Sequence, residues 1–289
     1  MEATDFLHPR DNHSSFIFYR YDPSLAAAII FAVLFAAVTS AHLVHAIRFR
    51  TGYFTPFIVG GCFEIVGYVG RIASHFARYS LGPFITQSIF LLVAPAFFAA
   101  SIYMVLGRII RFLDGERYSM IRVQWLTKIF VTGDVFSFFV QAGGAGIASG
   151  GASKYELGHK IIIAGLCLQI VIFGFFVISA IVFQRRIQAH PTVSSSDPKS
   201  QWRRHLTVLY LVSALILLRS VVRVVEYAHG NDGWIIAHEV MLYLFDALLM
   251  LGLVVVLFIV HPDQLLSQQR ELPSSEGSLA LQELHQPKK

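Results

Sequence analysis

Residues 160–183 read KIIIAGLCLQIVIFGFFVISAIVF and contain no charged side chain after the first position. A helix needs about 20 apolar residues to cross the hydrocarbon core of a bilayer. Six further apolar runs approach or exceed this length, at residues 24–47, 55–76, 83–106, 126–148, 206–226 and 236–260. Only helices satisfy their own backbone hydrogen bonds in lipid at this length. The sequence therefore predicts an all-α, polytopic membrane protein built as a bundle of seven transmembrane helices.

The composition leaves no room for a separate soluble domain, because 55% of the 289 residues are hydrophobic and only 14% are charged. We expect one membrane domain at residues 24–262, preceded by an extracellular segment at 1–23. The cytoplasmic tail at 263–289 is rich in Gln, Ser, Pro and Glu, a composition typical of disorder. The first apolar run is too long for a signal-peptide core and lacks a small-residue cleavage site, so we expect it to remain as a span.

Basic residues are distributed unevenly between the two sides of the predicted bundle. The loops after spans one, three and five carry most of them: Arg48, Arg50, Arg108, Arg111, Arg117, Arg122, Lys128, Arg185, Arg186, Lys199, Arg203 and Arg204. This bias predicts an outer N-terminus and a cytoplasmic C-terminus. It also explains the net charge of +5 without a nucleic-acid partner. The sequon at Asn12 falls on the predicted outer side, where it could be glycosylated.

Four predicted spans carry polar side chains at helical spacing. In span two, Glu64, Tyr68 and Arg71 stand at i, i+4 and i+7, which places them on one helical face. The fourth, sixth and seventh spans show related spacing: Asp134 and Gln141; Arg219, Arg223 and Glu226; Glu239, Tyr243 and Asp246. A charged side chain at mid-bilayer costs roughly 2.5 to 3.5 kcal/mol on insertion scales, so these groups should face one another or a wet cavity.

Helical rise, at ~1.5 Å per residue, gives the depth of each polar side chain. Glu64, Asp134 and Asp246 fall near the midplane. The other charged groups fall in the outer half: Arg71, Arg219, Arg223, Glu226 and Glu239. We therefore predict a substrate-binding pocket with an acidic floor and a mixed-charge mouth. The alternative is that these ion pairs and hydrogen bonds only hold the helices together, at ~0.6 kcal/mol each.

Glycine and proline mark two further features of the spans. Residues 141–146, QAGGAG, remove side-chain bulk from the outer half of span four, which favours close packing of a neighbouring helix and also leaves room for a ligand. Pro95 lies within span three, where it is expected to kink the helix. The carbonyl groups that such a kink releases need other hydrogen-bond partners.

The sequence favours no enzyme class and no cofactor. His42 and His45 lie at the inner end of span one, whereas the remaining span-edge histidines fall on the outer side, away from the floor carboxylates. There is no HExxH motif, nucleophile elbow or phosphate-binding glycine loop followed by Lys. Cys62 and Cys167 indicate neither a disulfide framework nor a metal motif. A zinc-dependent membrane hydrolase, with His75, His238 and Glu239 as ligands, is kept as an alternative.

Several motifs together resemble one family. These are residues 64–71 (EIVGYVGR), Asp134 with 141–146, residues 219–226 (RSVVRVVE), Glu239 with Tyr243 and Asp246, residues 92–96 (LVAPA) and His261-Pro262. In this order they resemble the fungal RTA-like, or lipid-translocating exporter, family over residues 24–262. Val222 departs from the pattern, since an aromatic residue is expected between the two arginines.

The resemblance implies a multi-pass protein of the fungal plasma membrane or vacuole that moves sphingoid long-chain bases or toxic amphiphiles, and in some relatives porphyrins. We therefore expect a lipid or amphiphile as the partner, bound in the polar intramembrane pocket. The cationic head of a sphingoid base suits the floor acids, whereas a phosphate suits the arginines at the mouth. A seven-helix receptor or sensor of lipid or membrane stress is the other alternative, and the oligomeric state is left open.

Overall fold

A computed structural model describes residues 24–76, 81–148, 152–196, 201–228 and 239–262 of the chain. Within these ranges every regular element is a helix, and seven segments are long and apolar enough to cross a membrane. This confirms the predicted all-α bundle, and the chain is an integral multi-pass membrane protein. The predictions for Asn12 and for the tail from residue 263 onward lie outside the described residues.

The first three spans are continuous helices. They are α1 (Leu25–Phe49), α2 (Thr55–Phe76), which follows the short 3-10 turn η1 (Gly52–Phe54), and α3 (Leu81–Phe112). Helix α1 begins after Ser24, whose side chain accepts a hydrogen bond from the backbone N–H of Ala27, as an N-cap residue does. It ends at Arg50 in the left-handed conformation, with φ of 53°. Helix α3 continues through Pro95 without interruption.

The second half of the chain contains the longest helix and an irregular last span. After the 3-10 turn η2 (Glu116–Tyr118) come α4 (Val123–Ala148), α5 (Ala152–Ala189), the short α6 (Val193–Ser196) and α7 (Trp202–Ala228). Helix α5 extends beyond the predicted span of 160–183 at both ends. The last span consists of α9 (Glu239–Leu242), a π-helical turn η4 (Tyr243–Ala247) and α10 (Leu248–Ile259). Such π-bulges are rare and often occur at functional sites.

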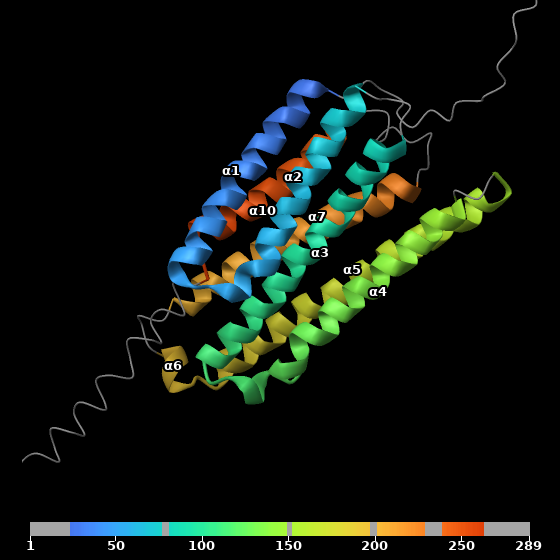
Figure 1. Cartoon of the computed structure of the whole chain (residues 1–289). Helices are drawn as coiled ribbons and strands as arrows, with labels where there is room; N and C mark the ends of the chain where they lie inside the picture. Colours follow the sequence, from blue (N-terminus) through green and yellow to red (C-terminus); the bar gives the residue numbers. More distant parts are fainter. Residues whose placement is uncertain (1–23, 77–80, 149–151, 197–200, 229–238, 263–289) are drawn as a thin grey trace, which may run out of the picture.

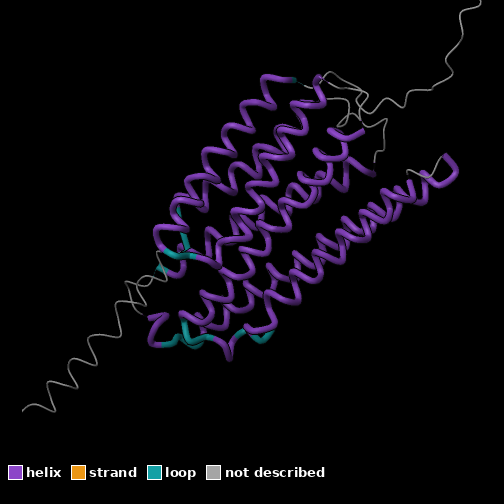
Figure 2. The backbone as a smooth tube through the Cα atoms, viewed as in Figure 1, coloured by secondary structure: helices purple, strands orange, loops and turns teal. Residues whose placement is uncertain are grey.

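The helices are arranged around α3 and α7, which lie between two flanking groups (Figure 1). Helices α1, α2 and α10 form one flank, while α4 and α5 run side by side along the other. Helix α3 contacts α2, α4 and α7, and α7 contacts α3, α5 and α10. Figure 2 shows how little of the described chain lies outside helices. Helix α3 therefore separates the side chains of α2 from those of α4.

The predicted close packing at the glycine motif is seen for one of its members. A Cβ atom at Gly144 would lie 2.8 Å from the carbonyl oxygen of Gly158, so α4 and α5 approach each other at a distance that only glycine permits. Gly143 and Gly146 have no such neighbour, since a Cβ there would meet no atom within 4 Å. Among the three glycines of the motif, Gly144 therefore makes the close approach to α5, and the other two lie on the open face of α4.

An aromatic core lies between α3, α4 and α5. The ring of Tyr103 is fully buried, with its centroid 4.6 Å from that of Phe176 and 5.3 Å from that of Phe130. Rings in such edge-on or tilted arrangements pack closely and contribute about 0.5 to 1.5 kcal/mol per pair beyond their buried area. This packing fixes the direction of the Tyr103 hydroxyl, which points toward Asp134 of α4.

Candidate functional site

Four charged residues of the last two spans form an ion-pair network that is buried at one end and half-buried at the other. Arg219 of α7 pairs with Asp246 of η4, and both side chains are less than a tenth exposed. Arg223, one helical turn further along α7, lies 3.1 Å from a carboxylate oxygen of Glu226 and 3.8 Å from the second oxygen of Asp246. Asp246 thus faces two arginines. The π-helical turn places Asp246 toward α7 at this point of the last span.

Arg219 makes a second contact, to the backbone of α3. Its Nη2 donates a hydrogen bond of 2.6 Å to the carbonyl oxygen of Leu91. Leu91 stands four residues before Pro95, so its carbonyl is the group that would accept the helical N–H of residue 95, which proline lacks. The carbonyl freed by Pro95 thus accepts its hydrogen bond from a side chain of another helix. The guanidinium of Arg219 joins α3, α7 and the last span.

Helix α2 contributes its polar stripe to the same network. Arg71 donates through Nε to the Tyr243 hydroxyl at 2.8 Å and also lies over the Tyr243 ring. Tyr68 is fully buried and stacks near Tyr243, with 6.5 Å between ring centroids. Glu64 is 1% exposed and feels the charges of Asp246 and the two arginines of α7. Its Oε1 has no hydrogen-bond partner among the described residues.

A separate polar group lies on the other side of α3. The Tyr103 hydroxyl donates a hydrogen bond of 2.8 Å to Oδ2 of Asp134, which is 4% exposed. Gln141, on the same face of α4, donates through its amide nitrogen to the side-chain oxygen of Gln169 on α5, at 3.2 Å. In the described part of the chain, the other carboxylate oxygen of Asp134 has no hydrogen-bond partner.

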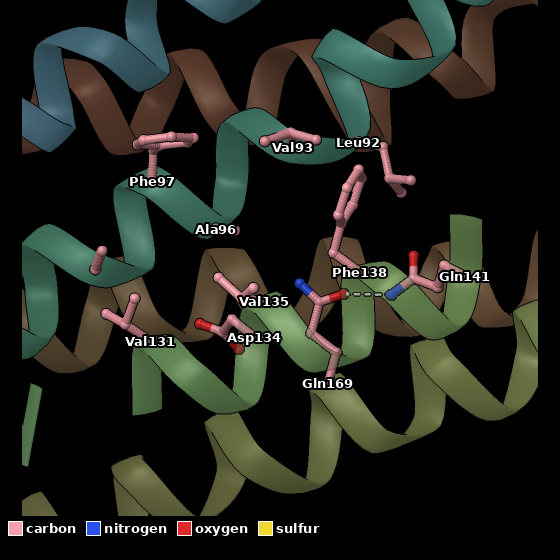
Figure 3. Close-up of a pocket in the computed structure, with 11 residues that line it drawn as sticks. Leu92, Val93, Ala96, Phe97, Val131, Asp134, Val135, Phe138, Gln141 and Gln169 are labelled. Atoms are coloured by element: carbon pink, nitrogen blue, oxygen red, sulfur yellow. Dashed lines mark hydrogen bonds between the residues drawn. The ribbon is translucent and has the colours of Figure 1, made fainter. Parts of the chain in front are cut away.

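Asp134, Gln141 and Gln169 line a cavity of about 120 Å³ between α3, α4 and α5 (Figure 3). Its other walls are apolar and come from α3 and α4: Leu92, Val93, Ala96, Phe97, Ala100, Val131, Val135 and Phe138. Val135 is 47% exposed, so the cavity reaches the outer surface of the bundle, which faces lipid in a membrane. The cavity thus combines a polar base with apolar walls, and we call it the α3–α4 pocket.

The structure divides the predicted pocket residues between these two places. Direct contacts join Arg219, Arg223, Glu226 and Asp246 in one group and Arg71 with Tyr243 in another, and Glu64 and Tyr68 are buried beside them. Asp134 and Gln141 lie in the α3–α4 pocket instead. The common floor expected for Glu64, Asp134 and Asp246 does not form, because equal depth along a helix does not fix which neighbour a helix faces. Glu239 begins α9, and its side chain lies outside the described part.

Two polar residues in or next to the α3–α4 pocket are not among the site residues predicted from the sequence. Gln169 is an uncharged polar residue inside the most apolar run of the chain, and Tyr103 is a tyrosine inside span three. Each was a detectable signal, since polar groups within a span tend to hydrogen-bond across helices. The predicted stripes relied on charged residues, and neither helix carries a charged stripe at these positions.

No metal site emerges from the residues that the structure describes, where no group of three His, Cys, Asp or Glu side chains could hold an ion. Cys62 and Cys167 are free thiols. The histidines at the predicted cytoplasmic end do gather, and the rings of His45 and His261 lie 3.9 Å apart. His42 donates through Nε2 to the carbonyl oxygen of Val254 at 3.0 Å, so its role in the fold is to join α1 to α10.

Comparison with known proteins gives the family. Residues 57–269 match the model of the family described as RTA1 like protein. The chain is 38% identical to Protoporphyrin uptake protein 1 of Saccharomyces cerevisiae, over 86% of this chain and 92% of that protein. It is 36% identical to Protein RTA1 of the same yeast, covering 86% and 85% of the two chains.

A more distant relative is Sphingoid long-chain base transporter RSB1 of Saccharomyces cerevisiae, strain Lalvin EC1118, at 27% identity over 83% of this chain and 72% of that protein. No solved structure matches the chain. The family match covers well over half of the chain and confirms the resemblance seen in its motifs. The chain belongs to the RTA1-like family of fungal membrane proteins.

Proposed function

We propose that this protein is a membrane translocator of lipids or other amphiphiles, and that the α3–α4 pocket receives a cationic head group. One observation carries the proposal. Asp134 is buried at the base of an otherwise largely apolar pocket, and one of its carboxylate oxygens has no hydrogen-bond partner among the described residues. A carboxylate in such surroundings attracts a cation far more strongly than it would in water.

The shape of the pocket suits an amphiphile that enters from the membrane. A cavity of about 120 Å³ holds a small head group, since an engineered cavity of about 150 Å³ in another protein binds benzene. It does not hold an alkyl chain of many carbons. The partly exposed wall at Val135 lets such a chain lie along the outer surface of α4, in lipid. The head is thus bound by polar groups while the tail stays in a hydrophobic phase.

The polar residues at the bottom of the α3–α4 pocket can bind the head group of a sphingoid base. Its ammonium group donates hydrogen bonds and carries the positive charge that Asp134 matches. Its hydroxyl groups can exchange hydrogen bonds with the amides of Gln141 and Gln169, which now bond to each other. We propose that ligand binding replaces this amide pair, so that no polar group at the base is left without a partner.

The names of two relatives support an amphiphilic substrate, but the substrates that they name carry opposite charges. One is named a sphingoid long-chain base transporter, and a cationic base fits Asp134. The other is named a protoporphyrin uptake protein, and protoporphyrin carries carboxylates that Asp134 would repel. We favour the cationic amphiphile because Asp134 is the only charged residue among those that line the described pocket.

The ion-pair network has a different role in this proposal. Its acids face arginines already, so they offer a cationic ligand less than Asp134 does. We propose that the network holds α2, α7 and the last span in register and acts as a gate at the outer end. The tail is proposed to be cytoplasmic, the N-terminus to lie outside, and the plasma membrane, rather than the vacuole, to be the compartment.

Two other classes of function predict different behaviour. A receptor or sensor of lipid or membrane stress would bind the same ligand and couple it to a cytoplasmic partner, but would not move it across pure liposomes. A metal-dependent hydrolase would contain zinc after purification and would cleave the lipid. We propose that neither applies and that the protein has no catalytic activity.

Transport in reconstituted liposomes tests the proposal. Wild-type protein should move a fluorescent long-chain amine between leaflets faster than empty liposomes, and Asp134→Asn should reduce this rate at least tenfold. Glu156→Gln is the matched control, because the Glu156 side chain is 87% exposed and stands 13 residues before Gln169 on α5, about 20 Å along the helix. Equal rates for Asp134→Asn and wild type would refute the assignment of the pocket, and hydrolysis of an amide-linked or ester-linked lipid added to the same liposomes would favour the hydrolase.

A further inference from the structure

The contact between Arg219 and Leu91 lies directly behind the α3–α4 pocket. Leu91 is 1% exposed and its carbonyl oxygen faces α7. The next two residues of α3, Leu92 and Val93, line the pocket, as does Ala96 one turn later. One turn of α3 therefore has its backbone held by Arg219 on one side and presents side chains to the pocket on the other.

That turn is the weak point of α3. Pro95 cannot donate to the Leu91 carbonyl, and a proline inside a helix removes one backbone hydrogen bond and bends or loosens the helix. In the membrane there is no water to satisfy a released carbonyl. The position of Leu92 and Val93 relative to Ala96 is then set by whatever group replaces the missing N–H.

Arg219 supplies that replacement and is itself held in place. Its guanidinium is fixed by the ion pair with Asp246, and the side chain is about 5% exposed, so it has little freedom to move away from Leu91. Arginine can serve two acceptors at once because its five N–H donors lie in one rigid plane. The guanidinium that donates to the Leu91 carbonyl is therefore held by Asp246 of the last span rather than by a residue of α3.

We propose that Arg219 is a positioning residue for the α3–α4 pocket: it replaces the helical N–H that Pro95 lacks and so fixes the pocket wall formed by Leu92, Val93 and Ala96. The inference rests on the proposed function, because it concerns the pocket assigned there to the head group. Arg219 does not line the pocket, and its effect on the ligand is exerted through the backbone of α3.

A double-mutant cycle between residues 95 and 219 tests this link. Pro95→Ala restores an N–H for the Leu91 carbonyl, and Arg219→Met removes the replacement donor while keeping an unbranched, though shorter, side chain. Binding of a fluorescent long-chain primary amine is measured on purified protein in lipid nanodiscs. We expect Arg219→Met to weaken binding at least tenfold in the wild-type background and at most threefold in the Pro95→Ala background. Equal losses in both backgrounds would overturn the proposal.

A second readout separates positioning from a general loss of stability. The same proteins are titrated with a trimethylammonium amphiphile of equal chain length. A displaced wall changes the ratio of the two affinities, because it alters the room available to the head group. Fewer folded molecules would lower both binding capacities and leave the ratio as it is in wild type, which would contradict a positioning role. If Arg219→Met does not accumulate, Arg219→Met with Asp246→Asn removes the unpaired acid and is tested in its place.

Asp134→Asn separates this inference from the proposed function. If Asp134→Asn binds the amine as wild type does, the pocket is wrongly assigned and the positioning role falls with it. If Asp134→Asn loses binding while the cycle between residues 95 and 219 is additive and the affinity ratio is unchanged, the pocket stands and only the role of Arg219 is refuted.

Discussion

Tyr103 of α3 donates a hydrogen bond of 2.8 Å to Asp134 of α4, and both residues are buried. This bond is the polar link between the aromatic core and the base of the α3–α4 pocket. It satisfies one oxygen of a carboxylate whose other oxygen has no hydrogen-bond partner in the described structure. Asp134 is thus held in one orientation and still has one oxygen to offer a ligand.

Tyr103→Phe should destabilise the protein, because it leaves the second oxygen of Asp134 unsatisfied as well. An unsatisfied buried group costs about 1 to 3 kcal/mol. Thermal unfolding of the detergent-solubilised protein, followed by intrinsic fluorescence, measures the change. Tyr210→Phe is the matched control, since the Tyr210 hydroxyl is buried without a hydrogen-bond partner among the described residues and its removal should be neutral. Equal unfolding temperatures for both variants would show that the Tyr103 bond contributes nothing.

Arg223→Glu should impair folding, because it places a third acid beside Glu226 and Asp246. A buried ion pair broken by removal of one partner costs about 3 to 5 kcal/mol. The charge swap Arg223→Glu with Glu226→Arg should recover part of the folded protein, because it restores the pair with residue 226 but leaves an acid facing Asp246. The amount is read by size-exclusion chromatography of a fluorescent fusion. Recovery of transport as well would indicate a structural lock, whereas recovery of folded protein alone would indicate a gate.

The matched control for that experiment is an exposed pair. Arg111 and Glu116 lie 3.7 Å apart with both side chains more than half exposed, and such pairs are worth about 0 to 1 kcal/mol. Arg111→Glu should therefore accumulate as wild type does. Arg223→Glu protein that folds and transports normally would show that this arginine neither locks nor gates.

Gly158→Ala should weaken the α4–α5 contact. A Cβ atom at Gly158 would overlap the backbone of Gly144 and Ala148, so the two helices would have to move apart. We expect a loss of about 1 to 3 kcal/mol, the range typical of overpacking. Gly143→Ala, where a Cβ meets no atom within 4 Å, should be neutral or stabilise the helix. The prediction fails if the two variants unfold at the same temperature.

Acidification should destabilise the predicted cytoplasmic end through His261. Burial, with the nearby charges of His45, His42 and His205, lowers the pKa of His261 to about 3 from an ordinary value of 6.5. The unfolded chain therefore binds more protons than the folded chain between about pH 6.5 and pH 3, and stability falls as the pH falls through this window. The unfolding temperature of wild type should drop between pH 7 and pH 5 more steeply than that of His261→Gln. Parallel pH profiles would exclude His261 as the cause.

The proposed orientation has a direct test in cells. A C-terminal pH-sensitive fluorescent protein should report cytosolic pH, because the basic loops place the tail on the cytoplasmic side. An epitope inserted before Asp22 should be reached by antibody on intact spheroplasts. An epitope that reacts only after permeabilisation would reverse the assignment of the outer and inner ends of the bundle.

Helical spacing predicted which residues share a helix face, but not which helices are neighbours. Helical spacing placed Arg219 and Arg223 on one face of span six, and in the structure both arginines face Asp246. The same reasoning placed Asp134 with Glu64 and Asp246, because all three share a depth. The order of helices around the bundle puts α3 between them, and the loops of a helical bundle do not reveal that order.

The sequence by itself determined the number and approximate extent of the spans and the family, because apolar length and motif order are properties of the chain. It also indicated which faces are polar and that Pro95 would release a carbonyl group. Only the tertiary structure decided that Arg219, more than one hundred residues away, bonds to that carbonyl, and that Asp134 lies in a pocket of its own. Contacts between helices depend on their rotation and neighbours, which are set by packing across the whole bundle rather than by the pattern within any one span.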